Sequence, residues 1–192
     1  IRRARERSGA DPLYVCCTGC PTNVASALLL APEIAENIVV VWLGGNARHR
    51  EYTREFNMRQ DVAAARVVMA NAPFVQLPCA GVVSEFRISA PELDYWLVGK
   101  NELTDYLAGI VKAEAESYAK GKPWTRVIWD VTAVAWLLND EDRFMHSVLM
   151  PVHLPDSECR SEEAALDRTM AMVVEIKRDR LMEDLFSKLT NA

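Results

Sequence analysis

The chain has 192 residues, an apolar content of 50% and a formal net charge of −5 at pH 7. This much apolar sequence can bury a core without disulfides or metals, so we expect one soluble globular domain over residues 1–192. The acidic balance argues against a nucleic-acid partner, whose footprint would be a basic patch. No apolar run approaches the roughly 20 residues that a membrane span needs, so we expect no membrane partner.

The N-terminus is basic, with Arg2, Arg3, Arg5 and Arg7 directly after Ile1. A secretory signal would show an apolar stretch here, and we interpret this segment as an exposed amphipathic helix. Because the first residue is not Met and a helical pattern is already under way, we expect the chain to be a fragment that begins inside a helix.

Five cysteines stand at irregular spacing, which is typical of a reducing compartment and predicts a cytoplasmic protein. Cys17 and Cys20 have Cys-x-x-Cys spacing, found in zinc sites and in redox pairs at the start of a helix. A zinc site would need a second ligand pair, and the three histidines are isolated from one another and from this motif. We favour packing as small apolar side chains, with a redox pair as the alternative.

The first half of the chain alternates predicted strands and helices. They are a strand at Leu13–Cys17, a helix at Thr22–Leu30, a strand at Ile38–Leu43, a helix at Val62–Asn71 and a strand at Phe74–Leu77. Pro21 opens the first helix and Pro32 ends it, while Asp61 is the expected cap of the second. The second strand is β-branched throughout and stops at Gly44-Gly45, which is typical of a strand buried on both faces of a parallel sheet.

The second half is predicted to be more helical. It contains helices over 90–98 and 102–120, a strand over 126–129, a helix over 131–138, strands over 147–154 and 169–176, and a helix over 180–189. Ser89, Asn101, Asp130 and Asp179 are the expected helix caps. The helix after Asp130 is almost wholly apolar, which predicts a central, buried position. The last two strands are expected to pair at the periphery of the sheet.

This alternation implies an α/β fold with a mostly parallel, Rossmann-like sheet and helices on both faces. Right-handed crossovers gather the carboxyl ends of parallel strands at one edge, where open sheets bind ligands. Thr18, the Gly44-Gly45 pair and Asp130 each follow a predicted strand. Residues far apart in the sequence are therefore expected to share one site.

Four segments stand out by their motifs and their order. They are 13–23 with its Thr-Gly turn, 40–45 ending in Gly-Gly, 53–57 (Thr-Arg-Glu-Phe-Asn) followed by Asp-Val-Ala-Ala-Ala, and 129–135 (Trp-Asp-Val-Thr-Ala-Val-Ala). In this order and spacing they resemble the inosine-uridine nucleoside hydrolase family. Residues 169–176 and the closing helix also follow the C-terminal pattern of that family. The resemblance implies that family's fold, incomplete at the N-terminus here, and hydrolysis of the N-ribosidic bond of nucleosides.

The resemblance also implies a calcium cofactor at the base of a pocket. In the family the ion is held by aspartates, one main-chain carbonyl, waters and ribose hydroxyls. Thr18 matches the carbonyl ligand and Asp130 the distal carboxylate, and an all-oxygen shell suits this hard cation. The family's general base belongs to an N-terminal aspartate motif that this sequence lacks, so no residue is assigned to that role.

The implied substrate contacts come from the same segments. Asn57 and Glu55 match side chains that bind ribose hydroxyls, and Asp130 is also expected to contact the substrate. Leu43 matches a Met that packs on the sugar. Trp129 occupies the position that faces the base, where an indole can stack on a purine. Each residue also has a structural interpretation: Asp130 as a helix cap, Glu55 and Asn57 as loop polar groups, Leu43 and Trp129 as core.

One departure from the family lies in the loop between Gly45 and Glu55, which is shorter and more basic and lacks a ribose-binding Asn at the family's position. We expect purine nucleoside hydrolysis when the missing aspartates are supplied. The alternative is a non-catalytic ribose- or nucleoside-binding relative; a Rossmann nucleotide binder is disfavoured because no Gly-x-Gly-x-x-Gly motif is present. The expected partners are a nucleoside and either further copies of the chain or a missing N-terminal fragment.

Overall fold

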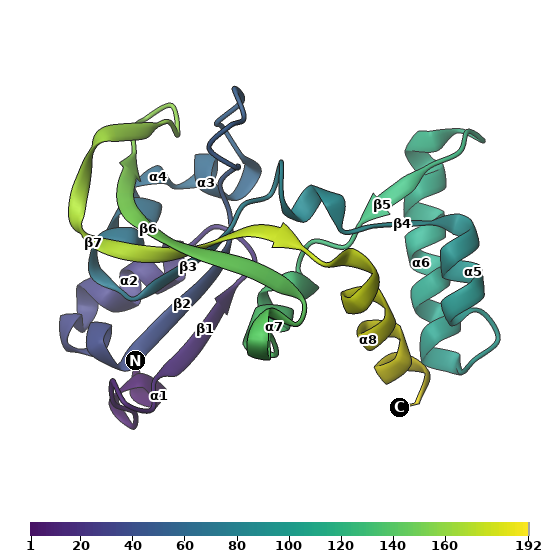
Figure 1. Cartoon of the computed structure of the whole chain (residues 1–192), viewed down its shortest axis with the longest axis horizontal. Helices are drawn as coiled ribbons and strands as arrows, with labels where there is room; N and C mark the ends of the chain where they lie inside the picture. The colour runs from purple at the N-terminus through teal and green to yellow at the C-terminus, as the bar shows by residue number, and fades with distance from the viewer. Residues whose placement is uncertain (192) are drawn as a thin grey trace.

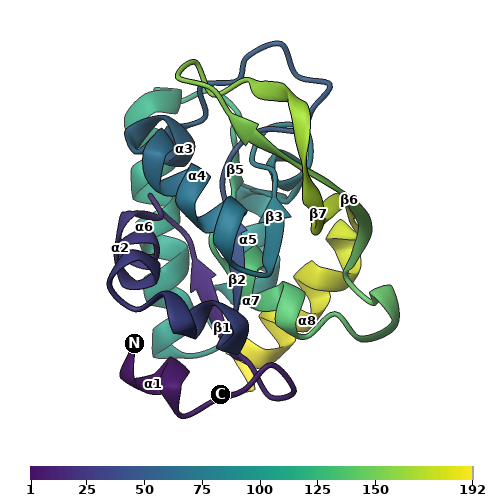
Figure 2. The same ribbon diagram turned by 90° about the vertical axis from the view of Figure 1, so that its left-hand side faces the viewer.

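The computed structural model describes residues 1–191 and is built around a five-stranded sheet (Figure 1). Its strands are β1 (Leu13–Cys17), β2 (Ile38–Leu43), β3 (Phe74–Leu77), β6 (Met145–Pro155) and β7 (Ser161–Ile176). They lie in the order β1-β2-β3-β7-β6, which Figure 2 shows across the molecule. The first four strands of this order run parallel, and β6 runs antiparallel to β7. The predicted mostly parallel α/β sheet, with a terminal strand pair, is confirmed.

Eight α-helices connect or flank these strands in the described residues: α1 (Arg2–Arg5), α2 (Thr22–Leu30), α3 (Phe56–Gln60), α4 (Val62–Asn71), α5 (Ala90–Leu97), α6 (Glu102–Ala119), α7 (Val131–Leu137) and α8 (Arg178–Thr190). Short 3-10 turns are η1 (Pro32–Asn37), η2 (Val83–Glu85) and η3 (Asp140–Asp142). Several caps form as predicted: the Asp61 carboxylate accepts from the Ala64 N–H at 2.9 Å, and the Asn101 side chain accepts from the Thr104 N–H at 2.9 Å. None of the helices within residues 1–191 has the length and apolar character that crossing a membrane requires.

The central strand β2 is buried on both faces, as its continuous apolar sequence predicts. Val41 and Leu43 pack in the cluster that holds the buried residues of α7 and α8, whereas Val40 and Trp42 pack with those of α2 and α4. Each of these four side chains is at most 2% exposed. Successive strand residues point to opposite faces, so one strand supplies the centre of two cores and fixes the position of its own carboxyl end.

The predicted strand over 126–129 does not join the main sheet. β5 (Thr125–Val127) pairs antiparallel with β4 (Arg87–Ser89), a strand that the sequence analysis missed. After β3 the chain leaves the sheet and builds α5 and α6 at the other end of the molecule before it returns (Figure 1). A three-residue strand without a fully buried side chain is unsuited to a sheet covered on both faces, which explains the correction.

Three predictions about helices are wrong in detail. α7 is not buried all round: Val134 is 50% exposed, because the helix packs on β1 and β2 with one side only. Asp130 stands at the N-cap position of α7, but its backbone is already helical and its side chain makes no capping hydrogen bond. Asp179 is not the cap of α8, which begins at Arg178, two residues earlier than predicted, with Lys177 at the N-cap position.

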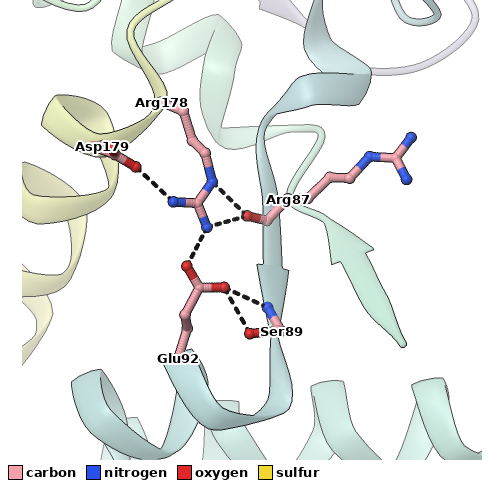
Figure 3. Close-up of polar contacts among 5 residues, drawn as sticks. All are labelled: Arg87, Ser89, Glu92, Arg178 and Asp179. Atoms are coloured by element: carbon pink, nitrogen blue, oxygen red, sulfur yellow. Dashed lines mark hydrogen bonds and ion pairs between the residues drawn. The ribbon is translucent and has the colours of Figure 1, made fainter. Parts of the chain in front are cut away.

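A polar cluster ties the C-terminal helix to the β4–α5 segment (Figure 3). The Arg178 guanidinium donates two hydrogen bonds to the carbonyl oxygen of Arg87, at 2.9 and 2.6 Å, and one to the Asp179 carboxylate at 2.7 Å. It also pairs with Glu92, whose second oxygen accepts from the Ser89 N–H and hydroxyl, both at 2.8 Å. One guanidinium on α8 therefore joins the C-terminal helix to β4 and α5, which come much earlier in the sequence.

Candidate functional site

The carboxyl ends of β1, β2 and β3 open into a cavity of about 590 Å³. This is the edge at which open parallel sheets bind ligands. The residues that line it are Thr18, Leu43, Asn46, Tyr52, Glu55, Phe56, Asn57, Cys79, Ala80, Arg126, Trp129 and Asp130. All six residues that the sequence analysis assigned to the site are among them. The fold therefore brings the predicted residues together in one place.

The Gly44-Gly45 turn ends β2 at the cavity wall, and its geometry requires both glycines. A Cβ on Gly44 would lie 2.2 Å from the Trp42 ring, and a Cβ on Gly45 would lie 2.5 Å from Nε2 of Gln76. Gly45 also has a φ of +72°, in the left-handed region that favours glycine. Gln76 is 4% exposed and donates to the Gly44 carbonyl oxygen at 2.9 Å, which fixes the turn from below.

Glu55 is buried at 7% exposure, and its carboxylate organises the loop that follows the glycine turn. One oxygen accepts from the N–H groups of Gly45 at 2.9 Å and Met58 at 3.0 Å. The other oxygen accepts from the Asn57 N–H at 2.9 Å. Glu55 is thus the side-chain cap of α3, and its carboxylate is engaged by three backbone N–H groups.

Asn57 joins the ends of two neighbouring strands. Its side-chain N–H group donates to the Leu43 carbonyl oxygen at 2.9 Å and to the Thr18 carbonyl oxygen at 3.4 Å. The adjacent Thr18-Gly19 turn is fixed by Trp42, whose indole N–H donates to the Gly19 carbonyl oxygen at 2.8 Å. With its amide nitrogen engaged on the strand ends, Asn57 has its side-chain oxygen left as an acceptor for a ligand hydroxyl.

Trp129 and Asp130 enter the site from the segment between β5 and α7. Trp129 lines the cavity and also packs, partly buried, against the core below α7. Its carbonyl oxygen accepts from the Thr132 hydroxyl at 2.6 Å and from the Thr132 N–H at 3.2 Å, so the first turn of α7 fixes its backbone. Asp130 is exposed, and its carboxylate is not engaged in capping the helix.

The described residues do not fit a calcium ion on their own. Calcium takes 6–8 oxygen ligands, whereas the two ligands expected here are the Thr18 carbonyl and the Asp130 carboxylate. Within residues 1–191, no three His, Cys, Asp or Glu side chains are arranged to hold a metal. The described residues therefore do not form a zinc site at Cys17 and Cys20 either. Cys17 is buried, and its thiol donates to the Gly19 carbonyl oxygen at 3.5 Å.

Several lining residues were missed by the sequence analysis. Cys79 is the second residue after the end of β3, so the strand-end rule could have found it. The pKa of the Cys79 thiol is raised, first by burial, then by the charge of Glu55 and a hydrogen bond to it, and then by the charge of Asp130. The thiol is therefore neutral at physiological pH. Tyr52 and Phe56 are 65% and 64% exposed at the cavity, and no local sequence signal marks either one.

Arg126 is the cation of the cavity lining. It extends from β5, and its guanidinium pairs with Glu114 of α6 at 3.1 Å. The ion pair holds the β4–β5 ribbon against α6 and leaves part of the side chain exposed at the cavity. The sequence analysis placed this residue in a strand but did not assign it to the site.

Comparisons with known proteins identify relatives of this chain. The chain is 29% identical over 141 residues to proteins named pyrimidine-specific ribonucleoside hydrolase RihA from Salmonella enteritidis and Salmonella typhimurium. The match covers 70% of this chain and 45% of each relative, so the chain spans about half the length of the curated relatives it matches.

A solved structure is similar in fold. The inosine-uridine preferring nucleoside hydrolase from Bacillus anthracis superimposes with a TM-score of 0.68 at 20% identity, over 93% of this chain and 60% of that one. The family model described as inosine-uridine preferring nucleoside hydrolase matches residues 1–183. This chain accordingly belongs to the inosine-uridine preferring nucleoside hydrolase family.

Proposed function

We propose that this chain forms part of an active site that hydrolyses the N-ribosidic bond of nucleosides to ribose and a free base. The observation that carries the proposal is the single cavity lined by all six residues that resemble the family's site. In the reaction, water adds at the anomeric carbon while the bond to the base nitrogen breaks, through an oxocarbenium-like state. No described residue is assigned as the general base. A cytoplasmic location is part of the proposal, and the five free thiols support it.

The proposed ribose contacts follow from the acceptors that the fold leaves open. Ribose hydroxyls are hydrogen-bond donors, and the side-chain oxygen of Asn57, whose amide nitrogen is engaged on the ends of β1 and β2, would accept one of them beside the Glu55 carboxylate. Leu43, at the end of β2, would pack on the sugar ring. The Thr18 carbonyl and the Asp130 carboxylate would be two of the ligands of a calcium ion whose remaining shell the described residues do not supply.

The base is proposed to lie against Trp129, with purines preferred. A purine offers more surface for stacking on an indole than a pyrimidine does. The Salmonella relatives are named pyrimidine-specific, which is the opposite preference. The Bacillus protein is named inosine-uridine preferring, which includes one purine and one pyrimidine nucleoside. Competition between inosine and uridine as substrates therefore decides which base is preferred.

A second candidate function is ribose or nucleoside binding without turnover. It is favoured by one observation: the cavity offers acceptors for a sugar, while residues 1–191 hold no cluster of metal-binding side chains. Under this proposal the chain binds inosine and uridine but releases no ribose from either.

The experiment measures ribose release from inosine and uridine by a reducing-sugar assay, alongside nucleoside binding by saturation-transfer NMR. Asp130→Asn is the test variant, and Asp140→Asn, on η3 and outside the cavity, is its matched control. We expect the first variant to lower ribose release by about 100-fold or more, the range for loss of a charged group at a reacting centre, and the control to leave it unchanged. Ribose release that is equal in both variants would overturn the catalytic proposal, and nucleoside binding without release, once the N-terminal aspartates that the family resemblance implies are supplied, would establish the second candidate.

A further inference from the structure

A second cavity, of about 480 Å³, lies between the loop that links β2 to α3 and the hairpin of β6 and β7, and we call it the loop cavity. Gln76 of β3 and Met172 of β7 form its floor. The two are register partners in neighbouring parallel strands, so their side chains point to the same face of the sheet. Of its lining residues, Asn46 is the one that also lines the cavity of the candidate site.

Three contacts fasten the loop to the hairpin beside the loop cavity. The Thr53 hydroxyl donates to the Glu158 carbonyl oxygen at 2.8 Å, and the Arg54 guanidinium pairs with the Glu158 carboxylate at 2.8 Å. The Arg48 guanidinium donates to the Pro151 carbonyl oxygen at 3.1 Å. Figure 2 shows the loop and the hairpin turn side by side at the top of the molecule. The cavity is therefore bounded by two segments that side chains hold together.

Gln76 offers the loop cavity a hydrogen-bond acceptor although its side chain is 4% exposed. Every buried side-chain nitrogen and oxygen atom of residues 1–191 has a partner, whereas the Gln76 amide oxygen accepts no hydrogen bond from these residues. That oxygen therefore reaches open space, and the space that Gln76 lines is the loop cavity. The amide nitrogen uses one of its two N–H groups on the Gly44 carbonyl oxygen. A ligand that displaced water here without a donor would leave the amide oxygen unsatisfied.

The inner lining around Gln76 is rich in methionine. Four of the seven methionines of the chain line the loop cavity, and each is between 3% and 5% exposed: Met58, Met69, Met170 and Met172. The thioether sulfur is polarizable and makes favourable contacts with aromatic rings, and the flexible side chain adapts to their shape. This lining favours a flat aromatic ring over a compact polar molecule.

The rim of the loop cavity carries equal numbers of opposite charges. Its charged residues are Arg48, Arg50 and Arg160 on the one hand and Glu51, Glu162 and Glu163 on the other. Such a rim has no excess charge with which to select an ion. It suits a neutral ligand whose polar groups reach the rim while its ring lies among the methionines.

We propose that the loop cavity binds a neutral heteroaromatic ring with an N–H group beside a carbonyl group, which is the chemistry of a nucleobase. The ring lies among the four methionines, and its N–H donates to the Gln76 amide oxygen. The cavity falls in the range of small-molecule sites, about 300–1,000 Å³, and has room for a free base or for a base that carries a sugar. The proposal does not rest on the proposed function, because the ring is identified from the loop cavity alone and none of the proposed nucleoside contacts lines it.

The test is NMR of isotope-labelled methionine methyl groups while the chain is titrated with hypoxanthine or, separately, with inosine. We expect saturable shifts of the four methionines of the loop cavity and none of Met145 and Met182, which pack in the other core. The cavity of the candidate site is lined by no methionine, so a ligand bound only there leaves the four signals in place. Shifts with hypoxanthine alone identify a free base as the ligand, and shifts with inosine identify the base of a nucleoside. If neither compound moves the four signals, or if Met145 and Met182 move equally, the proposal is wrong.

Two controls test the place and the hydrogen bond separately. The N-methylated form of each ligand keeps the ring but has no ring N–H, and it should bind about fivefold more weakly or worse, because the Gln76 oxygen is left without a donor. Ser161→Trp puts a bulky side chain at the rim and should abolish the methionine shifts, whereas Ser157→Trp, exposed on the same hairpin and outside the cavity, should keep them. Circular dichroism verifies that both variants are folded. Equal affinity for the methylated form, or shifts that persist in Ser161→Trp, would overturn the proposal.

Discussion

The carboxylate of Glu55 lies 2.9 Å from the backbone nitrogen of Gly45, so one side chain fixes both the glycine turn after β2 and the first turn of α3. The two ends of the intervening loop are thereby held together at the cavity. Asn46 adds a second tie, since its side-chain oxygen accepts from the Ala80 N–H at 3.0 Å and its side-chain N–H donates to the Tyr52 carbonyl oxygen at 2.8 Å. The side chains of Glu55 and Asn46 therefore supply hydrogen-bond partners for backbone groups of the cavity wall.

We expect Glu55→Gln to destabilise the fold as well as the site. The amide nitrogen that replaces one carboxylate oxygen cannot accept a hydrogen bond, so at least one buried N–H group of Gly45, Asn57 or Met58 loses its partner. The cost of such an unsatisfied group is about 1–3 kcal/mol. Urea unfolding followed by tryptophan fluorescence measures it. Glu51→Gln, an exposed change in the same loop, is the control, and equal stability of the two variants would contradict this role of Glu55.

The sequence predicts the central elements well because local and tertiary signals agree there. β2 is apolar at every position and ends at two glycines, and the structure buries it on both faces. The β4–β5 ribbon was mispredicted because its pairing depends on contacts that the local pattern does not encode. Arg178, for example, holds the carbonyl oxygen of Arg87 from a helix at the other end of the sequence.

The candidate site was predictable where its residues follow strands. Thr18 and Leu43 end β1 and β2, so the strand-end rule is sufficient for them. Asp130 was expected beside them because it also follows a predicted strand; that strand, β5, lies outside the main sheet, so Asp130 reaches the cavity lining by a different route from the one predicted. Tyr52 could not have been found, because its loop is positioned by a distant contact: the Thr53 hydroxyl donates to the Glu158 carbonyl oxygen at 2.8 Å.

The pair of Glu92 and Arg178 should make the fold sensitive to acid. Burial raises the pKa of Glu92, but the hydrogen bonds from Ser89 and from Arg178 outweigh it, and the pKa lies below its ordinary value. A carboxylate whose pKa is lowered by folding stabilises the folded state at pH values above its unfolded-state pKa of about 4.3. This stability is lost as the pH falls through the folded-state pKa.

Glu92→Gln should therefore cost about 1 kcal/mol at neutral pH, a modest figure because the pair is partly exposed, and should cost little below the folded-state pKa. Thermal unfolding of wild type and variant at a series of pH values measures the difference. Glu163→Gln, an exposed carboxylate on β7, is the control. A difference between Glu92→Gln and wild type that does not shrink in acid would contradict the linkage.

The open edge of β1 predicts association between copies of the chain. β1 is the outer strand of the sheet and pairs only with β2 among the described residues. Unpaired backbone groups on such an edge can bind the edge of another copy, and a charge on the strand opposes this. We expect Tyr14→Lys to reduce light scattering on concentration or mild warming, whereas Tyr95→Lys, on α5, should not. Scattering that is unchanged by Tyr14→Lys would show that the β1 edge does not associate.

Calcium should bind this chain weakly or not at all. The expected protein ligands in the described residues are the Thr18 carbonyl and the Asp130 carboxylate, far fewer than the 6–8 oxygens that calcium takes. Isothermal titration of the chain with calcium chloride, repeated after a chelator, measures the affinity, and Asp130→Asn separates specific binding from surface effects. Tight, chelator-sensitive binding that Asp130→Asn abolishes would mean that other oxygens complete the shell.

The last prediction concerns Trp129 and the choice of base. An indole has no usable proton to donate to a leaving base, so Trp129 is expected to act by stacking, which is worth about 0.5–1.5 kcal/mol beyond burial. Inosine, adenosine and guanosine should then be hydrolysed in preference to uridine, and Trp129→Ala should lower purine turnover by about 2- to 10-fold more than pyrimidine turnover. Trp129→Phe, which keeps an aromatic ring, should retain part of the preference. The measurement is kcat/KM for inosine and uridine in active protein, with Trp124→Phe as a control outside the cavity. Equal losses on both substrates, or a wild type faster on uridine, would show that Trp129 serves the packing of α7 and that the base is selected by other residues.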